Sequence, residues 1–195
     1  DMSVLERKIK ERPGRQGLIV RDGVFSMDGD IVDLPGLVEL ADAYGLLSMI
    51  DEAHATGVVG ATGRGCEEHF HMEGRTDILM GTLSKAIGAE GGYACGSHIL
   101  AQYLKNRARS YIFSTSLSPV TMAAAKRALE LIEEEPWRVG RLQENIRWFC
   151  GQLRERGIET DSETAIIPIR IGAEEKALKV SGMLMERGFF IPAIR

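Results

Sequence analysis

The sequence predicts an α/β protein with a central, mainly parallel sheet and flanking helices, followed by the start of a smaller α+β domain. Short apolar runs alternate with stretches of helical periodicity over residues 1–130, which is typical of strands and helices that alternate along the chain. Residues 131–195 instead contain long helical stretches with a strand between them. At 195 residues, the chain is expected to hold one α/β unit and part of a second.

The first part of the chain contains clear start and stop signals. Pro35 suits the first turn of a helix, and Gly45 is a typical stop signal. A five-residue apolar run interrupted only by Ser48 predicts a strand that is buried on both faces. The expected elements are a helix over 3–11, a strand over 18–20, a loop over 22–33, a helix over 34–43 and a strand over 46–50.

The later part begins with a long loop over 55–76, rich in glycine and charge; loops of that length inside a domain are usually functional. Further on, Ser118 and Pro119 form a typical helix start, and Pro136 separates two long helices. The expected elements are strands over 78–80, 93–95, 111–113 and 166–171, helices over 99–107, 118–135, 139–156 and 174–187, and a strand beginning at Phe189.

Composition and charge exclude several classes of partner. The 24 Lys and Arg residues against 28 Asp and Glu give a net charge of −4, so there is no electrostatic case for binding nucleic acid or an anionic membrane. No apolar run approaches the roughly 18 residues of a membrane span. Three widely spaced cysteines favour a reducing, cytoplasmic location over a disulfide framework. The start at Asp1 and the abrupt end at Arg195 suggest a fragment.

The first constellation that could carry chemistry is Asp51-Glu52-Ala53-His54, directly after a predicted strand. Ligands of open α/β sheets bind outside the carboxyl ends of the strands, which places Asp51 and His54 where sites occur. One interpretation is a carboxylate that pairs with a heteroaromatic nitrogen. A second is the acidic strand end of a DEAH-type helicase, which needs a phosphate-binding G-x-x-x-x-G-K-[ST] loop that this sequence lacks. A third is that both residues merely cap the strand.

The second constellation runs from Gly81 to Gly92 and holds Lys85 between hydroxyls and glycines. Its position just after a strand makes a surface lysine unexpected, and a partly buried lysine amine is well suited to forming a Schiff base. Thr82 and Ser84 could bond phosphate oxygens, while the glycines allow sharp turns. The alternative is an ordinary turn with a solvated lysine.

Three further segments are less informative. The hydroxyl-rich stretch 109–119 precedes a helix start, where an anion could bind, although an ordinary N-cap is the favoured interpretation. The turn 23–29 holds a hydroxyl and a carboxylate without a clear role. Cys66, His69 and His71 match no standard metal-ligand spacing, so no metal site is predicted.

Taken together and in this order, five motifs resemble the α-oxoamine synthases, a family of pyridoxal 5′-phosphate enzymes with the aspartate-aminotransferase fold, fold type I. The resemblance extends over essentially the whole chain. It implies that residues 1–130 are the C-terminal part of the cofactor-binding large domain and residues 131–195 the beginning of the small domain. The motifs are Val24-Phe25-Ser26-Met27-Asp28-Gly29-Asp30, Asp51-Glu52-Ala53-His54, Gly63-Arg64-Gly65, Thr82-Leu83-Ser84-Lys85 and Phe113-Ser114-Thr115.

The resemblance implies roles for the residues around the cofactor ring. Lys85 would carry the cofactor as a Schiff base and later act as acid and base. Asp51 would pair with the pyridinium nitrogen and keep it protonated, so that the ring can accept carbanion electrons. His54 and Ser26 would bond the phenolic oxygen, and Ala53 would pack beneath the ring.

The resemblance also implies a phosphate site and a partner. Thr82 would bind the phosphate, with the hydroxyl of Ser84 beside it. Ser114 and Thr115 would reach the phosphate of the neighbouring subunit's cofactor. This arrangement implies a homodimer with the cofactor site at the subunit interface.

The reaction implied is a decarboxylative condensation of an amino acid with an acyl thioester. Segments 107–113, 166–169 and 190–195 are similar to the family members that join L-alanine to a pimeloyl thioester for biotin biosynthesis. The alternative is the branch that joins glycine to acetyl-CoA, and the acyl carrier could be coenzyme A or a carrier protein. Because the family's N-terminal third and C-terminal end are not among these residues, this piece alone is expected to be inactive.

Overall fold

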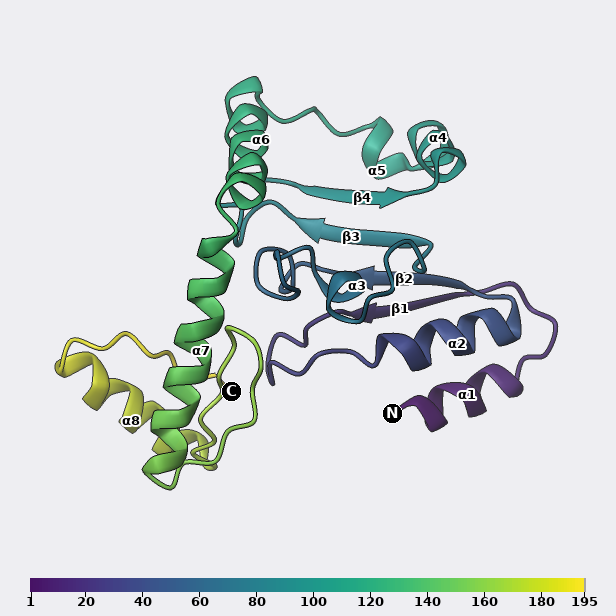
Figure 1. Ribbon diagram of the computed structural model, residues 1–195. Helices are drawn as coiled ribbons and strands as arrows, with labels where there is room; N and C mark the ends of the chain where they lie inside the picture. Colours follow the sequence, from purple (N-terminus) through teal and green to yellow (C-terminus); the bar gives the residue numbers. More distant parts are fainter. Residues whose placement is uncertain (195) are drawn as a thin grey trace.

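The computed structural model describes residues 1–194, so Arg195, the last residue of the segment 190–195, lies outside the described residues. Its centre is a four-stranded sheet whose strands follow one another in sequence order (Figure 1). The first three strands are parallel and the fourth is antiparallel to the third, which confirms the predicted mainly parallel sheet. The strands are β1 (Leu18–Asp22), β2 (Leu47–Asp51), β3 (Ile78–Thr82) and β4 (Gly92–Gly96).

The three parallel strands end at one edge of the sheet, at Asp22, Asp51 and Thr82; we call this the site edge. In the parallel register Asp22 lies opposite Asp51, and Asp51 lies opposite Met80. Because residues in register on neighbouring strands lie side by side, the carboxylates that end β1 and β2 are adjacent.

The helices begin and end at the signals seen in the sequence. Asp33 caps α2 by accepting a hydrogen bond from the Gly36 N–H at 3.1 Å, and Gly45 ends this helix in the left-handed conformation. Ser118 caps α6 by accepting a hydrogen bond from the Thr121 N–H at 3.2 Å. Each predicted helix agrees with the structure to within two residues at its ends. The helices are α1 (Met2–Lys10), α2 (Leu34–Tyr44), α3 (Cys66–His69), α4 (His98–Arg107), α5 (Arg109–Ile112), α6 (Pro119–Glu134), α7 (Trp137–Glu155) and α8 (Glu174–Glu186).

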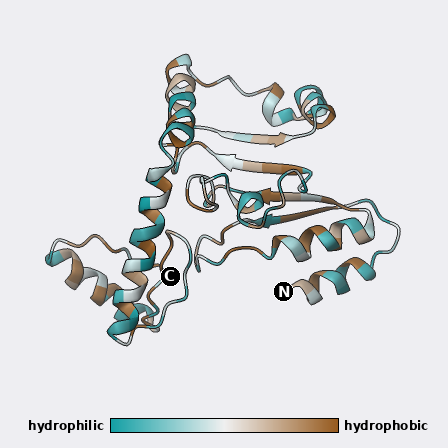
Figure 2. Ribbon diagram, viewed as in Figure 1, coloured by the Kyte–Doolittle hydropathy of each residue, from teal (hydrophilic) through white to brown (hydrophobic). Residues whose placement is uncertain are grey.

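The main core lies between α2 and the β1–β2 pair. Leu34 and Leu37 of α2 and Ile50 of β2 are fully buried in one apolar cluster, to which α1 adds partly buried side chains. Figure 2 shows the apolar colour concentrated in β1 and β2. A second, smaller cluster forms where Ala125 of α6 packs on the turn that follows β3. Both clusters therefore support segments that lead to or from the site edge.

β2 is buried on one face only, which corrects the prediction of a fully buried strand. Ile50 is completely buried, whereas Leu47 is 52% exposed, and Leu18 and Val20 of β1 are exposed as well. Side chains alternate across a strand. The helices α1 and α2 therefore cover one face, and the described residues leave the opposite face of β1 and β2 open. We call this second face the open face.

Residues 111–113 are not a strand as predicted. They form the end of the short helix α5, where the N–H groups of Tyr111 and Ile112 both bond to the carbonyl of Ala108. A three-residue apolar run is compatible with either type of element, and the local backbone hydrogen bonds decide in favour of the helix.

Two further predicted strands, over 166–171 and from Phe189, are also wrong, since neither segment pairs with another strand within residues 1–194. The chain just before the first is held differently: the buried Thr164 hydroxyl donates to the carbonyl of Gly29 at 2.9 Å. Between residue 131 and residue 194 the structure therefore contains helices and irregular segments, and the predicted α+β character of this part is not seen.

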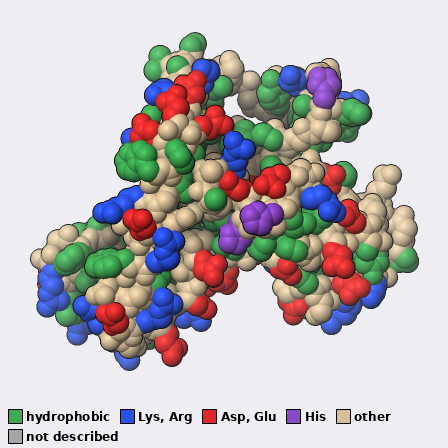
Figure 3. Space-filling model, viewed as in Figure 1, with side chains coloured by type: hydrophobic (Ala, Val, Ile, Leu, Met, Phe, Trp, Pro, Cys, Tyr) green, Lys and Arg blue, Asp and Glu red, His purple; other side chains and the backbone are tan. Residues whose placement is uncertain are grey.

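The long helices lie beside the sheet. α6 ends and α7 begins on either side of the predicted break at Pro136, and α8 lies at the far side of α7 (Figure 1). Figure 3 shows apolar side chains exposed over these helices. The domain boundary near residue 130 stays a prediction. None of the helices within residues 1–194 is both long and apolar enough to cross a membrane.

Candidate active site

Asp51 ends β2 and belongs to the open face of the sheet. Leu47, four residues earlier in the strand, lies on the same face. Its carboxylate accepts a hydrogen bond from the Ala53 N–H at 2.9 Å, and its carbonyl accepts one from the Gly23 N–H at 2.8 Å. The first bond fixes the carboxylate at the strand end, and the second joins the main chain of Asp51 to the loop that follows β1. The predicted placement of Asp51 at the carboxyl end of a strand is confirmed.

His54 lies in a tight turn that begins at the strand end, where the Ala55 N–H bonds to the carbonyl of Glu52 at 2.9 Å. Burial is the main reason that the pKa of His54 is lowered from its ordinary value, and the Lys85 ammonium lowers it further. The carboxylates of Asp51 and Asp22 act in the opposite direction. Such effects fall off with distance, so Lys85, Asp51 and Asp22 all lie within electrostatic range of the imidazole.

Lys85 lies in a closed turn between β3 and β4. The turn is held by the Leu83 N–H, which bonds to Gly91 at 2.9 Å, and by the Ala89 N–H, which bonds to Leu83 at 2.7 Å. Contrary to the sequence prediction, Lys85 is exposed. The side chain of Lys85 faces solvent, whereas Leu83 and Ile87 of the same turn are buried.

The hydroxyls of Thr82 and Ser84 lie 2.8 Å apart at the start of this turn. The Ser84 N–H also donates to the Thr82 hydroxyl, at 3.2 Å. Two hydroxyls beside an exposed backbone turn can donate to the oxygens of an anion. The structure therefore brings the pair together next to Lys85, and their role in binding phosphate stays a prediction.

The turn that carries Lys85 packs against the turn that carries His54. A Cβ atom on Gly57, which has a φ of +78°, would lie only 2.8 Å from the Cβ of Ala86. Only glycine permits this close approach. On its other side, Ile87 packs against Ala125 of α6. The lysine turn is thus held between α6 and the residues that follow β2.

Ser26 lies in the loop after β1 and is exposed. Its hydroxyl has no hydrogen-bond partner among residues 1–194. Its expected role, to bond the phenolic oxygen of the cofactor together with His54, stays a prediction. The loop itself is attached to the site edge through Gly23. Ser114 and Thr115 lie on the exposed connection between α5 and α6, and no hydrogen bond within residues 1–194 joins them to the other predicted site residues.

Two neighbours of the site were not singled out in the sequence. Asp22 was assigned to a loop, and only the strand register shows that it lies beside Asp51. Tyr93 of β4 bonds to the hydroxyl of Thr56 at 2.9 Å and lies against Gly81, which has no side chain to displace it. The alternation of side chains along the first predicted strand was the one signal that could have indicated Asp22.

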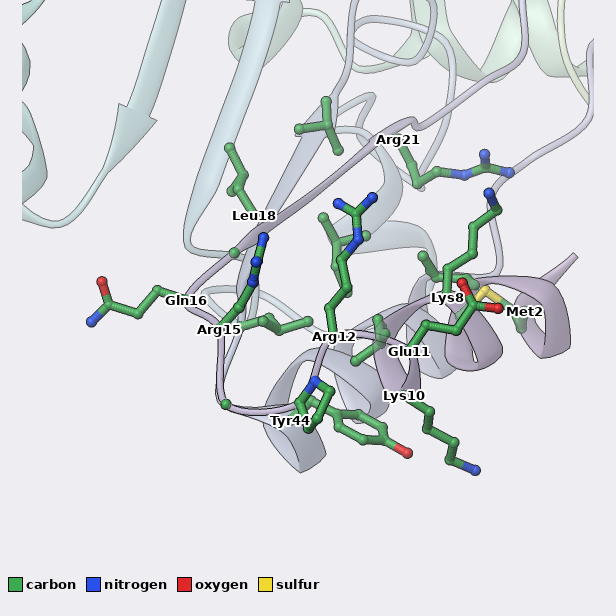
Figure 4. Close-up of a pocket in the computed structure, with 18 of the residues that line it drawn as sticks. Met2, Lys8, Lys10, Glu11, Arg12, Arg15, Gln16, Leu18, Arg21 and Tyr44 are labelled. Carbon is green, nitrogen blue, oxygen red and sulfur yellow. The ribbon is translucent and has the colours of Figure 1, made fainter.

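A groove of about 810 Å³ lies elsewhere, between α1 and the amino end of β1, lined by Arg12 and Arg15 among others (Figure 4). Asp51, His54 and Lys85 do not line it, so the candidate site is an open edge of the sheet rather than this groove.

The predicted long loop 55–76 contains the one-turn helix α3. The three residues considered as metal ligands in this loop differ in their exposure to solvent. Cys66 is buried in the core, whereas His69 and His71 are exposed. Within residues 1–194, no group of three or more His, Cys, Asp and Glu side chains could hold a metal ion.

Comparisons with known proteins bear on this arrangement. The sequence matches the family model for aminotransferase class I and II over residues 1–195. It is 49% identical over 196 residues to 8-amino-7-oxononanoate synthase 1 of Bacillus velezensis, a match that covers 100% of this chain and 50% of that protein. The chain thus spans about half the length of the curated relatives it matches.

Two solved structures are similar to it over nearly the whole chain. A serine palmitoyltransferase from S. paucimobilis with a bound PLP–myriocin aldimine superposes with a TM-score of 0.93 at 29% identity, covering 98% of this chain and 51% of that chain. The 8-amino-7-oxononanoate synthase from Francisella tularensis gives 0.83 at 29% identity, with coverages of 98% and 57%. The fold is that of these pyridoxal-phosphate-type transferases, and with a family match over its full length the chain belongs to the class I and II aminotransferase family.

Proposed function

We propose that this chain belongs to a pyridoxal-5′-phosphate-dependent C-acyltransferase of the 8-amino-7-oxononanoate synthase type. Such an enzyme condenses L-alanine with a pimeloyl thioester in biotin biosynthesis. The observation that carries the proposal is the contact of two turns at the site edge, where the close approach of Gly57 to Ala86 brings the Lys85 turn against the turn that carries His54, next to Asp51. The ammonium of Lys85 and the carboxylate of Asp51 both influence the pKa of His54. The 49% identity to the synthase of Bacillus velezensis supports the choice of reaction.

The donor set at the site edge suits pyridoxal 5′-phosphate. The exposed amine of Lys85 can bond to an aldehyde carbon, and the carboxylate of Asp51 can pair with a protonated ring nitrogen. The hydroxyls of Thr82 and Ser84 can bond phosphate oxygens, and Ala53 is small enough to lie beneath a ring. When bound, the cofactor supplies an electron sink for a carbanion at the α-carbon of the amino acid.

The residues of the chain then have distinct tasks. Asp51, held by the Ala53 N–H, keeps a negative charge at one position and so keeps the proton on the ring nitrogen. His54 has a lowered pKa, so it is neutral near pH 7 and can donate a hydrogen bond to the phenolic oxygen, together with Ser26. Lys85 is the amine placed to take the α-proton of the substrate and return it.

We further propose that the protein works as a homodimer, in which Ser114 and Thr115 serve the partner's cofactor site. Both residues are exposed, and large apolar side chains around them are exposed as well. Ile99 is 81% exposed, Phe113 76% and Val120 80%, and side chains of this kind gain stability when a partner covers them. The net charge of −4 gives no reason to expect nucleic acid or an anionic membrane as the partner.

The organisation of the chain is part of the same proposal. Residues 1–130 would be the C-terminal part of the cofactor-binding large domain, and residues 131–195 the beginning of the small domain. A cytoplasmic location is supported by the cysteines, since Cys66, Cys95 and Cys150 are all free.

Two alternative functions receive less support. Glycine C-acetyltransferase, which joins glycine to acetyl-CoA, would use the same cofactor residues, so only substrate choice separates it from the leading proposal. The DEAH-type helicase rested on Asp51 to His54 alone, and the family match over the whole chain favours the transferase instead.

The assignment of Lys85 is tested by borohydride reduction of the full-length, cofactor-loaded protein, followed by peptide mass spectrometry. Pyridoxyl label is expected on Lys85 in the wild type and on no peptide of Lys85→Ala. Lys176→Ala is the matched control, because Lys176 is an exposed lysine on α8, remote from the site in sequence. Label retained by Lys85→Ala would overturn the assignment.

Substrate choice needs a separate turnover assay of the full-length protein. We expect product from L-alanine with pimeloyl-CoA or a pimeloyl carrier protein, and little from glycine with acetyl-CoA. The reverse preference would favour glycine C-acetyltransferase, whereas nucleic-acid-stimulated ATPase activity would favour the helicase.

A further inference from the structure

Glu52 stands between two proposed site residues in the sequence, yet it belongs to the opposite side of the sheet. Asp51 lies on the open face, and the next side chain along the chain turns toward the covered face, where Glu52 is only 3% exposed. A carboxylate this deeply buried is costly unless hydrogen bonds compensate it. Its partners therefore indicate what it holds in place.

The carboxylate of Glu52 accepts hydrogen bonds from α3 and from the loop that leads to it. The Cys66 N–H donates to both carboxylate oxygens, at 2.9 and 3.2 Å. Cys66 is the first residue of α3, so the carboxylate satisfies a backbone donor that the helix leaves free. The loop before α3 is thereby attached to the end of β2.

The main chain of Glu52 makes three further connections. Its N–H donates to the carbonyl of Met80 on β3 at 2.6 Å, and its carbonyl accepts from the N–H groups of Ala55 and Thr56, both at 2.9 Å. One residue therefore joins β2, β3, the turn that carries His54 and the loop before α3.

The space around this carboxylate depends on glycines. A Cβ atom on Gly65, whose φ is +97°, would lie 2.5 Å from a carboxylate oxygen of Glu52, and a Cβ atom on Gly23 would lie 3.2 Å from it. Gly23 also bonds to the carbonyl of Asp51. The loops before α3 and after β1 thus close on Glu52 so tightly that a side chain at Gly65 would collide with it.

We propose that Glu52 is a positioning residue, whose buried carboxylate sets the place of Asp51 and of the turn that carries His54. The proposal rests on the proposed function, because it concerns the same site. Glu52 does not touch the reacting groups. It acts through Asp51 and through the turn that carries His54. A displacement of about 1 Å in such a site can reduce the rate by roughly a hundredfold.

Glu67 offers a matched control. It is also buried, at 8% exposed, and its carboxylate also accepts two backbone N–H bonds, from Gly74 at 2.9 Å and Thr76 at 2.7 Å. Its bonds hold residues 74–76, before β3, rather than the turn that carries His54. Glu52→Gln and Glu67→Gln therefore remove the same kind of group from the same kind of environment, but only the first removes a carboxylate that is bonded next to the site edge.

The test compares these variants in the full-length, cofactor-loaded protein, with circular dichroism to establish that each is folded. We expect Glu52→Gln to lower kcat roughly tenfold to a hundredfold with little change in KM, and to alter the absorption spectrum of the bound cofactor. Glu67→Gln is expected to keep kcat within about twofold. Equal losses in the two variants would overturn the proposal, because they would show a general loss of stability instead of lost positioning.

A second readout uses the cofactor-free protein, in which the titration of His54 is followed by NMR and assigned with His54→Gln. Removal of a negative charge disfavours the protonated imidazole, so the loss of the Glu52 charge by itself cannot raise the pKa of His54. If the turn loosens, His54 becomes less buried, and its pKa rises toward the ordinary value in Glu52→Gln but not in Glu67→Gln. An unchanged His54 titration in both variants contradicts the proposal.

Failure of this inference and failure of the proposed function give different results. If the wild type does not trap pyridoxal 5′-phosphate on Lys85, the proposed function is wrong. If the wild type traps it and Glu52→Gln behaves like Glu67→Gln, only the positioning role is wrong. Should Glu52→Gln fail to fold, Glu52→Asp serves in its place, because a side chain shortened by one methylene no longer reaches Cys66 in the same geometry.

Discussion

The segment 18–66 and the helices α4, α5 and α8 differ in how they place their apolar side chains. In the first region Leu34, Leu37 and Ile50 are completely buried in a single cluster formed by α2, β1, β2 and the loops around them, with partly buried side chains of α1 packed against it. In the second, α4, α5 and α8 have no fully buried residue, and Ile99 and Phe113 are more than three-quarters exposed.

The difference separates the frame that carries Asp51 and His54 from the helices whose apolar surface is left uncovered by the described residues. Asp51, Glu52 and His54 lie on a frame whose buried core residues all come from positions 19–66. The apolar surface of α4 and α5 is larger than an isolated surface residue would present, and such surfaces usually mark interfaces. Four predictions sharpen this comparison, from the largest expected effect to the smallest.

The largest effect is expected in the first core. Leu37→Ala removes a fully buried side chain and is expected to lower the free energy of unfolding by about 2–5 kcal/mol. Ile99→Ala, at a position 81% exposed, is expected to change it by no more than about 0.5 kcal/mol. Urea denaturation of both variants measures this difference. Similar losses at the two positions would show that the regions do not differ in packing.

Glu52 makes the first region sensitive to pH. Burial raises the pKa of Glu52 from 4.5 to about 7, so folding favours the protonated form. The stability that this provides is complete below pH 4.5 and is lost as the pH rises through about 7. Glu52→Gln cannot titrate, so its free energy of unfolding is expected to improve relative to the wild type by up to about 3 kcal/mol over that range. A difference that does not vary with pH would contradict the raised pKa.

The second region is expected to respond through association. Phe113→Ser changes a side chain that is 76% exposed and should leave the stability of the subunit nearly unchanged. If α4 and α5 form the dimer interface, the dimer dissociation constant should rise about tenfold or more, which corresponds to roughly 1.4 kcal/mol. Analytical ultracentrifugation over a range of concentrations measures this constant. Trp148→Ser on α7, at 66% exposed, is the control for a loss of apolar surface elsewhere.

The smallest effect concerns the electrostatics of the site edge. The Asp22 carboxylate raises the pKa of His54, so Asp22→Asn is expected to lower that pKa further. Lys85→Ala is expected to raise it, because a nearby positive charge is removed. NMR titration of the His54 imidazole distinguishes the two directions. A shift of the same sign in both variants would show that the three residues are not grouped as the structure places them.

Much of the fold could be predicted because its signals are local. Asp33, Gly45 and Ser118 act on backbone groups within three or four residues of themselves, so a helix boundary is encoded close to where it occurs. The failures also have a physical cause. A strand exists only where another strand pairs with it, and no local signal could show that residues 166–171 have no partner within residues 1–194.

The candidate site was predictable in its chemistry and less so in its surroundings. The carboxylate of Asp51 and the imidazole of His54 directly follow an apolar run, and the sequence places both at a strand end. The exposure of Lys85 was predicted wrongly, because burial depends on which distant segments cover a turn. The carboxylate of Glu52 was passed over, because its partner Cys66 lies fourteen residues away in a loop whose path the sequence does not specify.

The sequence by itself determined which reactive groups this protein has, in what order, and which of them end a strand. The tertiary structure decided which groups meet. The parallel register sets Asp22 beside Asp51, the close contact at Gly57 brings the Lys85 turn against the His54 turn, and the covered face of the sheet buries Glu52. The physical reason is that local propensity acts over a few residues, whereas proximity and burial depend on contacts between segments far apart in the chain.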